Sequence, residues 1–197
     1  MAGTGSFPLD LQGRTKRRPF QNQAVLAAIK SIIPITQTII DIGSSVGHMV
    51  RELRASGYSI YGIDGTEGIG QLSDGLVVQC DLTTLSEDQT THKSDWGIFF
   101  DVGEHIPRQY ENQVIKAVCS IPRIGLILSW ADHIVPDRKI HNRRTDYYIA
   151  NAFGLNGWVV DESLSEEIRK ASGDYVRMNE RLLVLHPVST EERECNV

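Results

Sequence analysis

The chain has 197 residues, with 20 Lys and Arg against 25 Asp and Glu and a formal net charge of −5. This length fits one domain with a proper core, and the acidic balance disfavours a large nucleic-acid footprint. No apolar run approaches the ~20 residues of a membrane span, so we expect no membrane association. Three cysteines without metal-type spacing (Cys80, Cys119 and Cys195) favour a reducing cytoplasm.

The chain begins with a basic segment that precedes the first predicted helix. Arg14, Lys16, Arg17 and Arg18 lie within residues 1–20, which we expect to form a flexible leader. The alternative is a lid or an anion grip over the active site. Apolar residues at helical spacing predict a helix over 21–33, and Pro34 ends it.

Two short apolar strands follow, at 38–42 and 60–64, and each carries an acid at its end. The spacing between Asp41 and Asp64 leaves room for one helix, which predicts a βαβ unit with a cofactor site at its carboxyl edge. The loop between them reads D-x-G-x-x-x-G, from Asp41 through Gly43 to Gly47, and its acid would repel a pyrophosphate. A cofactor with a ribose for Asp64, a cationic end for Asp41 and no phosphate fits this set, as S-adenosylmethionine does.

Predicted strands and helices alternate along the rest of the chain. It predicts strands at 96–101, 125–131, 158–160 and 180–186, and helices at 46–53, 110–118, 145–153 and 164–171. This order and its hairpin-like ending predict an α/β fold with a mostly parallel sheet and one antiparallel strand. We expect one domain over 21–188 and a flexible tail over 189–197.

Further motifs follow the glycine loop in order: Gln-Cys-Asp-Leu at 79–82, a strand ending in Glu-His-Ile-Pro at 104–107, Gly-Leu-Ile-Leu-Ser-Trp-Ala at 125–131, Phe-Gly-Leu-Asn-Gly-Trp at 153–158 and Arg-Leu-Leu-Val-Leu-His at 181–186. Together they resemble the class I S-adenosylmethionine-dependent methyltransferases over roughly residues 22–187. The resemblance implies a seven-stranded, mostly parallel sheet with helices on both faces and one antiparallel strand.

The same resemblance implies that the cofactor site is formed by the glycine loop and the ends of the next three strands. Asp81 would bind the adenine amino group. Ser45 replaces the middle glycine that this family usually has, which is tolerable if Ser45 keeps a negative φ. The implied cofactor residues are Asp41, Gly43, Ser44, Ser45, Gly47, Asp64, Gly65, Asp81, Leu82, Asp101, Val102 and Gly103.

Two histidines are candidates for the general base that hydroxyl methylation requires. His105 follows the fourth strand beside Glu104, and His133 follows the fifth strand; imidazole titrates near neutral pH. Trp130 and Asp132 would line the acceptor pocket with Glu104. The alternatives are a structural role for Glu104 and His105 in the turn, and a role for Trp130 as a lid on the core.

A third group, His141-Asn142-Arg143-Arg144, resembles a segment that follows the fifth strand in a subset of small methyltransferases. His141 and Arg143 could grip a carboxylate, a phosphate or sugar hydroxyls, and the alternative is a solvated helix cap. Glu104, Asp132 and the three histidines could also converge on a divalent metal, although no short spacing demands one, and we expect none.

The predicted function is O-methylation of a small molecule or glycan. The Asn-Pro-Pro-Tyr signature of amide or adenine methylation is absent after the fourth strand, and the fifth strand lacks the lysine of RNA ribose methyltransferases. Two alternatives stay open. One is an RNA or protein methyltransferase that uses the basic leader, and the other is a non-catalytic, methyltransferase-like binding subunit.

Overall fold

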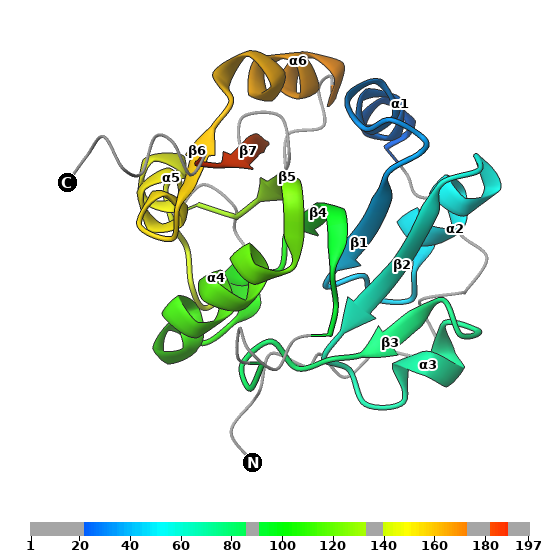
Figure 1. Ribbon diagram of the computed structural model, residues 1–197. Coiled ribbons are helices and arrows are strands. Elements are labelled where there is room, and N and C mark those ends of the chain that lie inside the picture. The colour runs from blue at the N-terminus through cyan, green and yellow to red at the C-terminus, as the bar shows by residue number, and fades with distance from the viewer. Residues whose placement is uncertain (1–21, 86–90, 133–139, 173–181, 189–197) are drawn as a thin grey trace.

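The computed structural model describes residues 22–85, 91–132, 140–172 and 182–188. These residues form one seven-stranded sheet in the order β3-β2-β1-β4-β5-β7-β6 (Figure 1). Strand β7 pairs antiparallel with both β5 and β6, whereas the other pairs are parallel. The predicted α/β sheet with one antiparallel strand is confirmed. The strands are β1 (Thr38–Ile42), β2 (Ser59–Asp64), β3 (Val77–Gln79), β4 (Ser94–Phe100), β5 (Pro122–Ser129), β6 (Trp158–Val160) and β7 (Leu183–Pro187).

Helices cover both faces of the sheet, as expected (Figure 1). One face packs against α1, α2 and α6 through a core that includes Val25, Leu53 and Ile168, and the other packs against α4 and α5 through Val114 and Phe153. None of the described helices is long and apolar enough to cross a bilayer. The helices are α1 (Gln23–Ile32), α2 (His48–Ala55), α3 (Ile69–Leu72), α4 (Glu111–Ser120), α5 (Asp146–Gly154) and α6 (Glu162–Ser172), with short 3₁₀ turns η1 (Gly103–His105) and η2 (Arg108–Tyr110).

Side-chain caps mark where α1 and α6 start. The Asn22 side chain accepts a hydrogen bond from the Val25 N–H at 3.0 Å, and Asp161 Oδ1 accepts one from the Leu164 N–H at 2.9 Å. The second cap explains why α6 begins before the predicted residue 164. Helix α3 was not predicted, because four residues carry too little periodicity to be recognised.

The strand order reverses between β1 and β4, which are neighbours in the middle of the sheet. In open α/β sheets, ligands bind at such a reversal, beyond the carboxyl ends of the strands. The loop after β1 contains the predicted glycine motif, and the loop after β4 leads into η1. The topology therefore places both predicted halves of the site at one edge.

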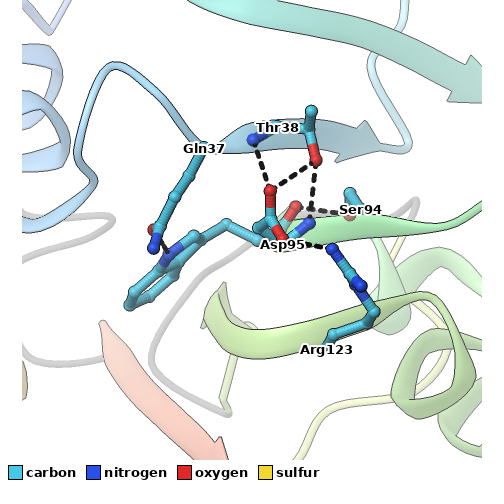
Figure 2. Close-up of polar contacts among 6 residues, drawn as sticks. Gln37, Thr38, Ser94, Asp95 and Arg123 are labelled. Atoms are coloured by element: carbon cyan, nitrogen blue, oxygen red, sulfur yellow. Dashed lines mark hydrogen bonds and ion pairs between the residues drawn. The ribbon is translucent and has the colours of Figure 1, made fainter.

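The opposite, amino edge of the sheet is held by a polar network around Asp95 (Figure 2). Its carboxylate accepts hydrogen bonds from the N–H and hydroxyl of Thr38 at 2.8 and 2.9 Å and pairs with Arg123 at 2.6 Å. These bonds, with those from Thr38 first, hold the pKa of Asp95 below its usual value. Trp96 Nε1 donates to Gln37 Oε1 at 2.6 Å beside it. The network joins β1, β4 and β5.

Candidate cofactor and acceptor site

The glycine loop turns sharply at the end of β1. Gly43 has φ +80°, and its N–H and that of Ser44 both donate to the Ile63 carbonyl, at 2.8 and 3.0 Å. A Cβ on Gly43 would lie 2.2 Å from Cγ2 of Val102, in the loop after β4. Only glycine fits at this position, because both the backbone angle and the close packing exclude a side chain.

Ser45 departs from the expectation for this loop. The structure gives Ser45 φ +52°, in the left-handed region, so the condition of a negative φ is wrong. That conformation costs a non-glycine residue about 1–2 kcal/mol and persists where the surroundings hold it. Here the Ser45 N–H donates to Asp64 Oδ2 at 2.8 Å, which ties the loop to the end of β2.

Asp64 therefore organises the backbone at the site. In addition to Ser45, it binds the Thr66 N–H through Oδ1 at 2.9 Å. Each carboxylate oxygen can accept a second hydrogen bond, so Asp64 keeps acceptor capacity for two ribose hydroxyls. The ribose contact stays a prediction.

Asp41 is a buried carboxyl group, 4% exposed, on the central strand β1. Burial raises its pKa from 3.8 to about 7; the Ser44 hydroxyl opposes this, and the nearby charge of Asp64 adds to it. A buried acid whose charged neighbour is another acid is suited to a cationic ligand. This environment fits the ammonium group of S-adenosylmethionine.

We expect this pKa to make cofactor binding depend on pH. Because the pKa of Asp41 is higher in the folded protein than in the unfolded chain, the protonated carboxyl favours the folded state. This contribution to stability is fully present below pH 3.8 and is lost as the pH rises through about 7. A cationic ligand binds the ionised form, so affinity for S-adenosylhomocysteine should fall by up to about tenfold for each pH unit below about 7. Calorimetric titrations of the parent and of Asp41→Asn measure this. Equal pH dependence in the two proteins would contradict the assignment.

The remaining predicted cofactor residues lie at the ends of β2, β3 and β4. Asp81 Oδ1 accepts hydrogen bonds from the Thr83 N–H at 2.9 Å and hydroxyl at 2.7 Å, and Leu82 is buried beside it. A Cβ on Gly65 would lie 3.7 Å from the Cys80 carbonyl, which brings the ends of β2 and β3 together. This position is compatible with the predicted adenine contact of Asp81.

Asp101 directly follows β4 and, like Ser45, has a left-handed conformation, with φ +52°. Its N–H donates to Ser129 Oγ at 3.0 Å, and the Ser129 hydroxyl donates back to Asp101 Oδ1 at 2.7 Å. This paired bond joins the carboxyl ends of β4 and β5 and fixes the start of the Val102–Gly103 turn. Ser129 was not predicted, since a single serine inside a strand carries no signal.

Two predicted acceptor residues lie in the core. Trp130 is 1% exposed, and a Cβ on Gly103 would lie 2.1 Å from its indole ring. Its Nε1 donates to the Asn142 carbonyl at 2.6 Å. Glu104 is 2% exposed. This burial argues against direct contact with an acceptor and supports the alternative interpretation of Trp130 as a core residue and Glu104 as part of the turn.

The other acceptor candidates are more accessible. His105 is half-buried on η1, with its N–H bonded to the Val102 carbonyl at 3.0 Å, and Asp132 is half-buried after β5. His141 is exposed, and Arg143 is half-buried with its guanidinium bonded to the Ile140 carbonyl at 3.2 Å. His133, the rival base, lies outside the described residues, as do the basic leader and residues 189–197.

A metal was the minority interpretation of these residues. Within the described ranges, no three His, Cys, Asp or Glu side chains are grouped as a metal site would need. His133 belongs to the proposed set but is not described.

A cluster that sequence reasoning missed lies behind the acceptor side. Glu111 at the start of α4 forms a two-pronged ion pair with Arg144, at 2.7 and 3.1 Å, and accepts a hydrogen bond from the Tyr148 hydroxyl at 2.5 Å. The Arg144 guanidinium also lies over the Tyr148 ring, 4.4 Å from its centre. The two charged residues stand far apart in the chain, so no local pattern could have paired them.

Comparison with known proteins supports the fold alone. No family model matches the chain, and no curated protein does. Solved structures do match: magnesium protoporphyrin IX methyltransferase from Synechocystis PCC 6803, with bound S-adenosylhomocysteine, is 19% identical over 84% of this chain and 83% of that one, with a TM-score of 0.60. The described fold is that of the class I S-adenosylmethionine-dependent methyltransferases.

Other solved structures with this fold differ widely in what their names say they do. The 1,6-didemethyltoxoflavin-N1-methyltransferase of Burkholderia thailandensis is 12% identical over 85% of this chain and 77% of that one, with a TM-score of 0.58. The [4+2]-cyclase SpnF is 11% identical over 90% and 86%, with a TM-score of 0.60. The activity of this chain must therefore be argued from its own site residues.

Proposed function

We propose that the protein is an S-adenosylmethionine-dependent methyltransferase that methylates a hydroxyl group of a small molecule or glycan. The observation that carries this proposal is the pairing of Asp41 and Asp64 around a glycine loop at the carboxyl edge of this fold. Asp41 offers a buried acid to a cationic group, Asp64 offers oxygens to a ribose, and Gly43 lets the loop after β4 pack closely against the glycine loop. No phosphate-binding loop of the G-x-G-x-x-G kind competes with this interpretation.

When bound, S-adenosylmethionine would supply an activated methyl group on sulfur. Transfer to a hydroxyl would form an O–C bond to the methyl carbon and break its S–C bond, with S-adenosylhomocysteine as the leaving group, so a residue of this chain would have to accept the hydroxyl proton. His105 stands on the turn next to Val102 and Gly103 and is the proposed base for that proton. The protein otherwise aligns the donor and the acceptor, and this alignment removes a large part of the activation barrier for a displacement of this kind.

Two measurements test the proposal in order. Calorimetry with S-adenosylmethionine and S-adenosylhomocysteine tests the cofactor, and absence of binding to both would overturn the proposal. Transfer from methyl-labelled S-adenosylmethionine is then measured against a panel of monosaccharides, small phenols and their amine counterparts. Labelling of hydroxyl compounds supports the proposal. Labelling of RNA with a steep loss at higher salt would favour the RNA alternative, and binding without any transfer would favour the non-catalytic one.

For His105 we expect a loss in turnover rather than in cofactor binding. Removing a general base costs about 10²–10⁴ in rate, so His105→Ala should lower turnover by that factor with little change in affinity for S-adenosylhomocysteine. His133→Ala is the matched comparison, because His133 is the rival base. Equal, small losses in both variants would mean that neither histidine acts as the base.

A further inference from the structure

The backbone of the segment 140–144 bonds to three residues at the carboxyl edge of the sheet, one on η1 and two just after β5. The N–H groups of His141 and Asn142 both donate to the Glu104 carbonyl at 2.9 Å, which joins the segment to η1. The Arg144 N–H donates to the Ala131 carbonyl at 3.2 Å, just after β5. With the bond from Trp130 to the Asn142 carbonyl, these contacts place the segment beside His105, the proposed base.

The side chain of Arg144 adds a fourth attachment, to α4. The side chain of Glu111 is 5% exposed and that of Arg144 is 20% exposed, so this ion pair is not a solvated surface pair. Burial alone would raise the pKa of Glu111, but hydrogen bonds from Arg144 and Tyr148 and the charge of Arg144 hold it below its usual value. The carboxylate is therefore ionised, and loss of either partner would leave a buried charge unpaired.

The side chains of the segment differ in how far they are exposed at this edge. Asn142 is fully buried and Arg144 is engaged with Glu111, whereas His141 is exposed and Arg143 is half-buried. If the backbone beneath these two side chains is held rigidly, their hydrogen-bond donors stay at fixed distances from the turn that carries His105. Alignment of this kind is sensitive, because a displacement of about 1 Å can cost about 10²-fold in rate.

We propose that Glu111 and Arg144 are positioning residues that clamp the segment 140–144 as the acceptor-binding wall of the site. This proposal rests on the proposed methyltransferase function. It assigns neither residue to the chemistry, since both act through the segment they hold. Tyr148 supports the pair by its hydroxyl bond to Glu111 and by its ring beneath the guanidinium.

Hydrogen exchange followed by mass spectrometry, with the protein saturated with S-adenosylhomocysteine, tests the clamp directly. We expect Arg144→Gln and Glu111→Gln to speed exchange in a peptide covering 140–147 by at least about tenfold, while peptides from β1 and β4 stay protected. Arg144→Lys, which keeps the charge but loses the fork of two bonds, should give an intermediate rate. Arg169→Gln is the control, because Arg169 pairs with Glu162 at 3.5 Å on α6, outside the site.

A second readout separates positioning from general stability. The acceptor concentration for half-maximal methyl transfer, measured with the labelled hydroxyl compound of the panel, should rise about tenfold in Arg144→Gln. Affinity for S-adenosylhomocysteine should stay within about twofold of the parent, because the cofactor contacts lie on other loops.

The outcomes distinguish this proposal from the proposed function. Unchanged exchange in 140–147, or a uniform increase across all peptides, would overturn the clamp even if the parent is an active enzyme. A parent that binds no S-adenosylhomocysteine would overturn the function, while exchange in the ligand-free protein still shows whether the ion pair holds the segment. If Arg144→Gln does not fold, Glu111→Gln and Arg144→Lys give the same comparison.

Discussion

Gly43→Val is expected to lose S-adenosylhomocysteine binding by at least about a hundredfold. Valine at φ +80° is strained, and its Cβ would lie 2.2 Å from Val102, so the loop after β1 and the loop after β4 must separate. The added methyl groups would also occupy space expected for the methionine part of the cofactor. Calorimetric titration of the purified variant measures the loss.

The chain offers a matched control for backbone strain. Gly75 has φ +77°, and nothing lies within 4 Å of the Cβ that it would carry. Gly75→Val should therefore lower the free energy of unfolding while leaving cofactor affinity close to the parent value. Similar losses of affinity in both variants would show that strain alone explains the effect, and the glycine loop would lose its assignment.

Asp64→Ala is expected to weaken S-adenosylhomocysteine binding by at least about tenfold, because hydrogen bonds to a charged group contribute about 1.5–3 kcal/mol each. The structure adds a second cause. Asp64 also holds Ser45 in its left-handed conformation and closes the turn to Thr66, so the glycine loop loses its anchor. We therefore expect faster amide exchange in residues 43–47 of this variant as well as the weaker affinity.

Asp95→Ala is the control for the loss of cofactor affinity expected in Asp64→Ala. Asp95 also accepts hydrogen bonds from a backbone N–H and a hydroxyl, but at the amino edge of the sheet. Its removal should lower stability without changing affinity for S-adenosylhomocysteine. If Asp64→Ala binds as tightly as the parent, the cofactor does not occupy this site.

The elements that sequence reasoning predicted well are those with local causes. The alternation of apolar residues, Pro34 after the first helix and the acids at the ends of β1 and β2 are all properties of short stretches. They gave the sheet, its antiparallel strand and the location of the glycine loop. The predicted bounds differ by a few residues where a cap such as Asp161 sets the start.

The features that were missed depend on contacts between distant parts of the chain. The φ of Ser45 follows from a bond to Asp64, and the burial of Trp130 follows from the absence of a side chain on Gly103. The ion pair between Glu111 and Arg144 joins α4 to the segment after β5, and neither residue carries a local signal for it. Such contacts become visible only when the strands are placed side by side.

The polar network around Asp95 has a consequence for how this scaffold could be redesigned (Figure 2). It ties β1, β4 and β5 at the edge remote from the glycine loop, so the central strands are also held by bonds that lie away from the loops that face a ligand. Loops at the ligand-facing edge could be exchanged or lengthened while the strands keep their pairing. The loops that would choose the ligand thus lie at one end of the central strands, and the polar network that holds these strands together lies at the other end.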